Sequence, residues 1–341
     1  RQFTDNLTMI RGKHTVKAGV DFGNFRMSSP PGAFGLGTGL ANNAAFGRFD
    51  FNGRFTQDGA AAQPAHAFAD FVLGYPNFTY RSTPTAVNLF YNTRYSAYAQ
   101  DDWQISPKFT LTYGIRYMVQ TPWRERDLAQ ANFDFASGRL VIPRSDLPPQ
   151  AQSRLFNAYP ISLDPNFAPL KTDRNNWQPR IGFAYRPFSG GKTVIRGGFG
   201  MFANFLPVFI GFRQMGFSNP PFLLAETFES AAGRTPSLTL ANPFPGGGAI
   251  SPNPGITIVE QNIRNSISNQ WNFTVEREIA KSLGFRASYV GNKTSHLPFY
   301  NYNANLPIVH QAGQIQPRRP YQPWADILML KGAGDSTIHQ L

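Results

Sequence analysis

Residues 95–117 limit the choice of fold most, because apolar and polar side chains alternate on both sides of a short turn. After the turn, the odd-numbered residues 109–117 are aromatic or aliphatic, whereas the even-numbered residues 110–116 are polar, small or charged. A period of two places one set of side chains on each face of an extended strand. The stretch therefore predicts a β-hairpin, closed by the turn at residues 106–108, with one apolar face and one polar face.

The strand before the turn follows the same pattern and carries a single charge, Asp101, on its apolar side. A water-soluble sandwich and a lipid-facing sheet both show such alternation, so the hairpin alone leaves both open. The pattern recurs along most of the chain, and about ten strands are predicted in all. The further hairpins span residues 6–25, 177–202 and 270–291, and other strands are predicted at residues 46–55 and 80–87.

The connections between the predicted strands alternate in length, which helps to decide between a water-soluble sandwich and a membrane barrel. Outer-membrane barrels have short periplasmic turns on one rim and long extracellular loops on the other, whereas a sandwich has no reason to sort its loops in this way. The alternation therefore predicts an all-β fold, an antiparallel up-and-down transmembrane β-barrel. The short connections lie near residues 12–13, 106–108, 189–192 and 280–282, and the long ones at residues 28–43, 121–176, 204–268 and from residue 292 onward.

Two further connections fit this alternation only with added assumptions. The run of residues 65–74 has Phe68, Phe71 and Val72 at helical spacing, and we expect it to form a packed helical connector. This connector would have to lie on the periplasmic side, and the short connection at residues 87–88 on the extracellular side.

The composition agrees with an all-β membrane protein and excludes other classes. Aromatic residues make up 14% and charged residues 15% of the 341 residues, and 31 Gly and 28 Pro supply turns, so neither a disordered nor a helical chain is indicated. No run of about 18 apolar residues is present, which excludes a spanning helix. The net charge of +12 is scattered, with no basic run beyond Arg318-Arg319, so nucleic acid binding is not predicted.

Insertion in lipid assigns the two faces of the predicted strands. A closed antiparallel barrel pairs its backbone polar groups internally, so only the outward side chains must be apolar. An arginine at the lipid midplane costs about 2 to 4 kcal/mol, so charged residues on the polar face are expected to line the lumen. Arg277 shares the apolar face and is expected at the rim. The predicted lumen-lining residues are Asp102, Arg116, Arg180, Arg186, Arg196, Glu276 and Arg286, and an aromatic girdle is predicted at Trp103, Trp177, Tyr185 and Trp271.

The long stretch of residues 204–268 is rich in phenylalanine. Its rings would either grip an apolar or sugar-ring ligand at the extracellular mouth or pack the loops against one another, and the sequence leaves both interpretations open. The candidates for ligand contact in this extracellular loop are Phe205, Phe209, Phe212, Phe217 and Phe222.

No arrangement of residues indicates an enzyme, a cofactor or a metal site. The run at residues 190–193, GGKT, lacks the glycine that a phosphate-binding loop needs at the position of Arg186, and a predicted strand follows it instead of a helix. Asp101 and Asp102 are adjacent and so point to opposite faces of a strand, which disfavours an acid–base pair. The five histidines are dispersed and cysteine is absent, so a metal site is not predicted.

Several motifs, in order over nearly the whole chain, resemble the barrel of Oar-like TonB-dependent receptors of the acidobacterial type. The resemblance implies a bacterial outer-membrane barrel of about 22 strands with a plugged lumen. Such a protein contacts outer-membrane lipid and lipopolysaccharide, is energised by the TonB complex through its plug, and binds a ligand for import. The motifs are FNGRFT at Phe51, ADFVLGYP at Ala69, YAQDDWQISPKFTLTYGIRY at Tyr98, NNWQPRIGFAYRPF at Asn175, GKTVIRGGFGMF at Gly191, QWNFTVERE at Gln270 and YVGNKTSHL at Tyr289.

The resemblance also implies that residues 1–341 are a fragment of the barrel domain, without the plug and the carboxypeptidase-regulatory-like domain of the family. The predicted function is energised import of a bulky nutrient such as an oligosaccharide, a peptide or a chelated metal. Two alternatives stay open, a non-enzymatic surface glycan-binding or adhesion protein and a passive porin. An adhesion protein would be soluble with a polar outer face, and a porin would have no plug.

The hairpin of residues 95–117 therefore has a predicted orientation relative to the membrane. Leu111, Tyr113 and Ile115 are expected to face lipid, and Arg116 the lumen. A Leu111→Arg change should therefore impair barrel assembly far more than Thr112→Arg.

Overall fold

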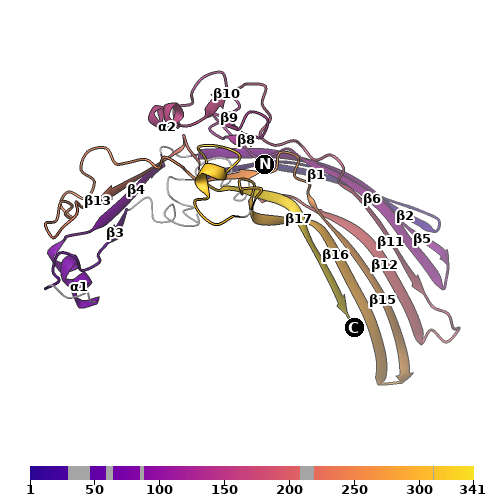
Figure 1. Cartoon of the computed structure of the whole chain (residues 1–341). Coiled ribbons are helices and arrows are strands. Elements are labelled where there is room, and N and C mark those ends of the chain that lie inside the picture. Colours follow the sequence, from indigo (N-terminus) through magenta and orange to yellow (C-terminus); the bar gives the residue numbers. More distant parts are fainter. Residues whose placement is uncertain (30–46, 59–63, 85–87, 208–218, 310) are drawn as a thin grey trace.

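The computed structural model describes residues 1–29, 47–58, 64–84, 88–207, 219–309 and 311–341 of the chain. Its largest feature is a curved antiparallel sheet, in which each long strand pairs with the next long strand along the chain (Figure 1). Within the described residues these strands are β1 (Gln2–Arg11), β2 (His14–Ser29), β5 (Asn88–Ser106), β6 (Phe109–Gln120), β11 (Trp177–Tyr185), β12 (Thr193–Asn204), β15 (Ser266–Ala280), β16 (Leu283–Asn303) and β17 (Ile327–Gln340). β1 and β17 lie at opposite ends of the series and do not pair with each other, so the sheet is open.

The predicted alternation sets the two faces of this sheet. Directly paired residues share a face, so Trp103 on β5, Leu111 on β6 and Phe183 on β11 form one apolar row. The row continues through Gly197 on β12 to Phe273 on β15. Gly197 leaves room for the Phe183 ring, because a Cβ at this glycine would lie 2.6 Å from a ring carbon. The aromatic ring thus covers the gap that the glycine leaves in the apolar surface.

The turns and loops are sorted by length, as the sequence predicts. Short turns join β1 to β2, β5 to β6, β11 to β12 and β15 to β16, and the long excursions leave the opposite ends of the strands. The hairpin of residues 95–117 is confirmed, because β5 and β6 pair over its whole length. The predicted antiparallel all-β architecture is confirmed with it.

Two strands that the sequence assigns to the barrel belong elsewhere. β2 pairs directly with β5, so no barrel strand lies between them in the sheet. The described parts of the two predicted strands form β3 (Arg48–Asp50) and β4 (Phe78–Pro84). β4 is the central strand of a separate three-stranded sheet, between β3 and β13 (Leu223–Glu229). Local alternation could not show this, because β13 comes from a different long excursion. The two connections that fitted the alternation poorly are therefore not barrel connections.

The end of the chain also differs from the prediction. The sequence predicts a loop from residue 292 onward, but β16 continues to Asn303 and β17 pairs with it. Small and polar residues at 332–337 interrupt the apolar alternation of β17, and its pairing with β16 is irregular between Thr294 and Tyr302. A strand with such a weak period resembles a loop in sequence.

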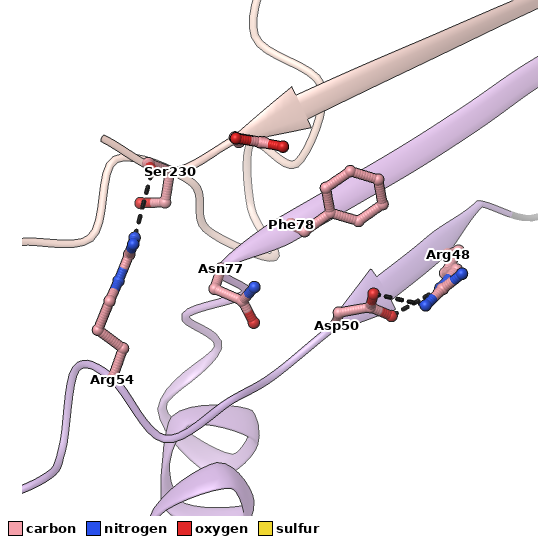
Figure 2. A pocket seen from close by; sticks show the side chains of 7 residues that line it. Arg48, Asp50, Arg54, Asn77, Phe78 and Ser230 are labelled. Atoms are coloured by element: carbon pink, nitrogen blue, oxygen red, sulfur yellow. Dashed lines mark hydrogen bonds and ion pairs between the residues drawn. The ribbon is translucent and has the colours of Figure 1, made fainter. Parts of the chain in front are cut away.

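The separate sheet projects away from the main sheet, and we call β3, β4, β13 and the helix α1 (Pro64–Leu73) the arm (Figure 1). Strand ends next to α1 enclose a small polar pocket (Figure 2). The predicted helix is confirmed, but it is not a packed connector, since Phe68, Phe71 and Val72 are 66%, 51% and 66% exposed. The arm leaves the long-loop rim, so the helix is also not periplasmic. Among the described residues no helix is long and apolar enough to cross a membrane.

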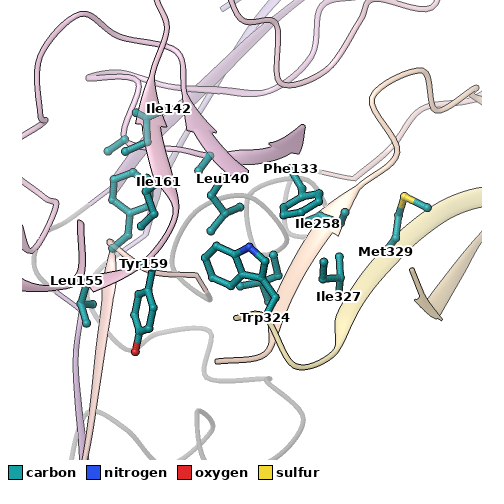
Figure 3. Packing of buried hydrophobic residues seen from close by; sticks show 14 residues of the cluster. Phe133, Leu140, Ile142, Leu155, Tyr159, Ile161, Ile258, Trp324, Ile327 and Met329 are labelled. Atoms are coloured by element: carbon teal, nitrogen blue, oxygen red, sulfur yellow. The ribbon is translucent and has the colours of Figure 1, made fainter. Parts of the chain in front are cut away.

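The other long excursions pack together above the sheet into a unit that we call the cap, made of residues 124–163, 256–259 and 304–330 (Figure 3). Trp324 is fully buried at its centre, and its indole N–H donates to the carbonyl oxygen of Gly138 at 3.2 Å. Apolar residues of all three segments surround this ring, so the predicted long loops have a hydrophobic core. The cap contains β7 (Arg124–Glu125), β8 (Asn132–Asp134), β9 (Arg139–Ile142), α2 (Ser153–Ala158), β10 (Ile161–Leu163), β14 (Ile256–Val259) and the 3-10 helix η2 (Gln316–Arg318).

Asn305 is fully buried and ties the last segment of the cap together. Its side-chain nitrogen donates to the carbonyl oxygens of Tyr321, Trp324 and Ala325 at 3.0, 2.8 and 2.8 Å. Its side-chain oxygen accepts a hydrogen bond from the backbone N–H of Tyr321 at 2.9 Å. Buried backbone groups that would otherwise lack partners are thus satisfied by one side chain.

Candidate functional site

The polar face of the main sheet carries the charged residues that the sequence predicts for a lumen wall. Asp102 on β5 stands opposite Thr112, whose hydroxyl donates to its carboxylate at 2.8 Å. Arg116 on β6 stands opposite Tyr98, and Arg180 on β11 stands opposite Gly114. The strand register therefore places these three predicted residues on one face of the sheet.

Three further predicted residues meet on the same face and form one ion-pair cluster. Arg196 on β12 places Nη1 3.3 Å from the Glu276 carboxylate of β15. Arg286 on β16 donates from Nε to the same carboxylate at 2.7 Å. Two guanidinium groups thus share a single carboxylate, and they link three neighbouring strands.

Arg186 lies apart from these residues. β11 ends at Tyr185, so Arg186 is in the turn that follows, and its side chain is exposed. Its backbone N–H donates to the carbonyl oxygen of Lys108 in the neighbouring turn at 2.8 Å. This residue therefore belongs to the short-turn rim of the sheet.

The register adds three charged residues that the sequence prediction did not include. Lys17 on β2 places Nζ 3.0 Å from the carboxylate of Asp102. Arg94 on β5 lies 3.5 Å from Asp21 on β2. Lys17 and Asp21 alternate with apolar neighbours, which is the signal that could have found them, whereas Arg94 follows Thr93 and is assigned to this face only by the pairing of β2 with β5.

Two arginines on the polar face form no direct salt bridge with a carboxylate among the described residues, although Arg116 lies near enough to Asp21 to interact with it electrostatically. Arg116 lies over the ring of Tyr98, with 5.2 Å from its guanidinium carbon to the ring centroid. Arg180 lies over the ring of Phe202 at 5.7 Å. Cation–π contacts hold these side chains in place without neutralising them. Arginines therefore outnumber the carboxylates with which they form salt bridges on this face.

The apolar face carries a charge on β5, Asp101, and the neighbouring strands cover it. His14 Nδ1 lies 2.6 Å from Asp101 Oδ2, and the Tyr113 hydroxyl donates to the same oxygen at 3.0 Å. The His14 ring stacks on Trp103, with 5.2 Å between the ring centroids. The Asp101 side chain is only 11% exposed as a result. The charged side chain of Asp101, which breaks the apolar alternation, is thus largely covered on the apolar face.

The phenylalanines proposed for ligand contact divide into groups. Phe222 lies outside the three segments of the cap but is 5% exposed and packs into their hydrophobic core, which favours the packing interpretation for this residue. Phe205 is half-buried and lines a narrow cleft with Trp123 and Leu206. The other three candidates, Phe209, Phe212 and Phe217, lie outside the described residues. Within the described part of the chain, no group of three or more His, Asp or Glu side chains could hold a metal ion.

Acidic groups of the cap respond to pH in a defined direction. The hydrogen bonds from the Arg126 guanidinium lower the pKa of Asp127, and the Ser137 hydroxyl lowers the pKa of Asp134. A carboxyl whose pKa is lower in the folded state contributes stability above its unfolded pKa, which is 3.8 here, and loses it as the pH falls through the folded value. We therefore expect the cap to open more readily below about pH 4.

Native-state hydrogen exchange of residues 124–163, corrected for intrinsic rates, measures this opening. The expected result is a loss of protection in the cap between about pH 4 and pH 2, with little change from pH 7 to pH 5. Protection that rises on acidification would contradict the assignment.

The geometry as a whole defines a class of protein. An antiparallel up-and-down sheet with an apolar face, a charged face and all its long loops on one rim is that of a transmembrane β-barrel. The chain belongs to the family of outer membrane beta barrel domains, whose model matches residues 1–341. The location in the bacterial outer membrane follows from this membership.

Solved structures with a similar shape include three bacterial receptors or transporters. The ferric enterobactin receptor PfeA of Pseudomonas aeruginosa is 10% identical, with a TM-score of 0.43, and the match covers 99% of this chain and 31% of that one. The FrpB iron transporter of Neisseria meningitidis is 10% identical, with a TM-score of 0.40 and coverage of 99% and 32%. The siderophore receptor PirA of Pseudomonas aeruginosa is 11% identical, with a TM-score of 0.33 and coverage of 99% and 45%. The chain thus spans less than half the length of each, and a search of curated proteins found no match.

Proposed function

We propose that residues 1–341 form part of the barrel of a TonB-dependent transporter that imports a bulky nutrient, such as an oligosaccharide, a peptide or a chelated metal. The observation that carries the proposal is the separation of the two sheet faces. An arginine at the lipid midplane would cost about 2 to 4 kcal/mol, so the face with Arg116 and Arg180 is the lumen wall. The opposite face, with the row from Trp103 to Phe273, contacts lipid and lipopolysaccharide.

The size of the sheet supports a wide barrel. The sheet curves through its nine long strands, among the described residues, without bringing β1 to β17. More strands are needed to close such a sheet, and barrels of 16 or more strands leave an aqueous channel or hold a plug. The sequence motifs that resemble TonB-dependent receptors favour the plug, which would also provide the contact with TonB.

The charges and the cap support selective rather than free passage. The arginines of the lumen wall attract anionic groups on a passing solute. The cap is a packed body at the extracellular rim, and a solute must move past it to reach the lumen. Scattered mobile loops would not present such an obstacle.

Planar-bilayer recording on the full-length protein, combined with a binding assay for the purified periplasmic domain of TonB, tests the proposal. We expect no steady ion conductance, because a plug fills the lumen, and saturable binding of the TonB domain. A large constant conductance without TonB binding would instead establish a passive porin. Recovery of the full-length protein in the soluble fraction without detergent would overturn the membrane assignment and favour the adhesion alternative.

A further inference from the structure

A polar pocket lies in the arm, away from the lumen wall and the cap core. It has a volume of about 380 Å³ and is formed where β3, β4 and β13 end (Figure 2). The long-loop rim is extracellular in this barrel class, so the pocket opens outside the cell. Its lining residues are Arg48, Asp50, Arg54, Asn77, Phe78, Glu229 and Ser230.

Backbone hydrogen bonds fix the walls of this pocket. The N–H of Asn77 donates to the carbonyl oxygen of Asp50 at 2.9 Å, and the N–H of Ser230 donates to the carbonyl oxygen of Asn77 at 2.9 Å. The Ser230 hydroxyl also accepts from the backbone N–H of Ser237 at 2.9 Å. Three chain segments are thus held at fixed separation, and the pocket is a built feature of the arm.

Both arginines of the pocket are held in place by oxygen acceptors. Arg48 donates from Nε and Nη2 to the two carboxylate oxygens of Asp50, each at 2.7 Å, and these hydrogen bonds raise the pKa of Arg48. Arg54 donates from Nη2 to the carbonyl oxygens of Ser230 and Ala231 at 3.2 and 3.0 Å. The guanidinium groups are therefore preorganised donors on two sides of the pocket (Figure 2).

Other polar groups of the pocket are unused. Glu229 is exposed and forms no ion pair with the described residues. The side-chain oxygen of Asn77 and the Nε of Arg54 are enclosed and have no hydrogen-bond partner in the described part of the chain. An enclosed polar atom without a partner destabilises the folded state. The two enclosed atoms lie beneath the pocket surface, whereas the Glu229 carboxylate is exposed and unpaired, and an unpaired carboxylate at a preorganised cavity indicates a place for a ligand.

The charge pattern limits the class of that ligand. The pocket lining has two guanidinium groups and two carboxylates, so its charges cancel. Neither an anion nor a cation is therefore attracted to the pocket by a net charge. The bidentate pairing with Arg48 occupies Asp50, which leaves Glu229 as the free carboxylate and disfavours a metal ion. A ligand that only donates hydrogen bonds would pair with the carboxylates but not with the guanidinium groups, and a ligand that only accepts them would do the reverse.

We infer that this pocket binds a neutral sugar ring, such as one residue of a glycan outside the cell. Each sugar hydroxyl both donates and accepts, so it can pair with Arg54 on one side and with Glu229 or Asn77 on the other. The Phe78 ring borders the pocket with the Arg48 guanidinium carbon 5.9 Å from its centroid, and its uncovered part is an apolar contact for the C–H face of the sugar. The inference concerns the arm alone and holds whether or not the barrel imports through TonB.

Ligand-observed NMR and calorimetry on the full-length protein in detergent test the inference. The probes are the neutral methyl glycosides of glucose, galactose, mannose and N-acetylglucosamine, with glucuronic acid and glucosamine as charged comparators. We expect at least one neutral glycoside to bind with a dissociation constant on the order of 1 mM, and more tightly than either charged sugar. Binding of none of the neutral glycosides, or tighter binding of glucuronic acid or glucosamine, would overturn the inference.

Variants locate the binding in the pocket. Glu229→Ala and Asn77→Ala are each expected to raise the dissociation constant of the tightest-binding neutral glycoside by about tenfold, since each removes hydrogen bonds to the sugar ring. Glu229→Gln keeps the shape and an acceptor oxygen, so it should weaken binding less than Glu229→Ala. The matched control is Glu278→Ala, which removes an exposed carboxylate near the short-turn rim and should leave binding unchanged. Equal binding by the wild type, Glu229→Ala and Asn77→Ala would place the sugar elsewhere and overturn the inference.

Discussion

Replacing Ile115 by arginine is expected to reduce the folded full-length protein in the outer membrane by about tenfold or more. Ile115 lies in the middle of β6 on the apolar face, opposite Ala99 and Pro179. An arginine there would meet the hydrocarbon near its midplane at a cost of about 2 to 4 kcal/mol. The heat-modifiable shift of the outer-membrane fraction on gels measures the assembled barrel.

Thr112→Arg on the same strand is the matched control. Thr112 lies on the polar face beside Asp102, so an arginine there gains a carboxylate partner and should assemble almost normally. Leu111→Arg should fall between the two, because Leu111 is only two positions past the start of β6 and the cost decreases toward the interface. If Ile115→Arg and Thr112→Arg impaired assembly equally, the two faces would be assigned wrongly.

The second large effect is expected at Glu226, which joins the arm to the cap. Its side chain is 3% exposed and lies 2.8 Å from Arg81 Nε and 2.9 Å from Arg154 Nη1. Arg81 is on β4 of the arm and Arg154 on α2 of the cap, and the backbone N–H of Gly248 also donates to this carboxylate at 3.1 Å. Glu226→Ala would leave two guanidinium groups facing each other without the carboxylate.

Removing one partner of a buried ion pair costs about 3 to 5 kcal/mol, and the partial exposure of both arginines places this case at the lower end. Protease cleavage within the arm should therefore become faster by a factor on the order of 100 in Glu226→Ala. Glu229 is on the same strand but forms no ion pair with the described residues, so the arm of the Glu229→Ala variant should be cleaved at the wild-type rate. Equal cleavage rates in these two variants would show that the Glu226 contacts do not hold the arm.

Much of the main sheet could be predicted, because its strands are amphipathic and are joined by short turns. The hairpin of β5 and β6, with its turn at residues 106–108, follows directly from a period of two in the sequence. The residues that share a face follow as well, once the register is known. Asp102 and Arg116 are examples, since their own alternation assigned them to the polar side.

The arm and the cap could not be predicted, because long-range contacts create them. β4 alternates like a barrel strand, and only its pairing with β13 from another excursion removes it from the barrel. The polar composition of the long excursions likewise concealed a core, since Trp324 and Leu140 are far apart in sequence and meet only in the fold. The phenylalanines of residues 204–268 show the same effect, with Phe222 packed inside the cap.

The contacts of Asp101 bear on how the strands find their pairing during assembly. A slip of one residue between β2 and β5 would move His14 away from Asp101 and would exchange the faces of the sheet. The carboxylate would then lose His14 and keep only Tyr113 on β6, at a cost of about 1.5 to 3 kcal/mol for the lost hydrogen bond to a charged group. Asp101 therefore stabilises the observed alignment on both sides of β5, because His14 reaches it only in the observed pairing of β2 with β5 and Tyr113 reaches it through the pairing of β5 with β6.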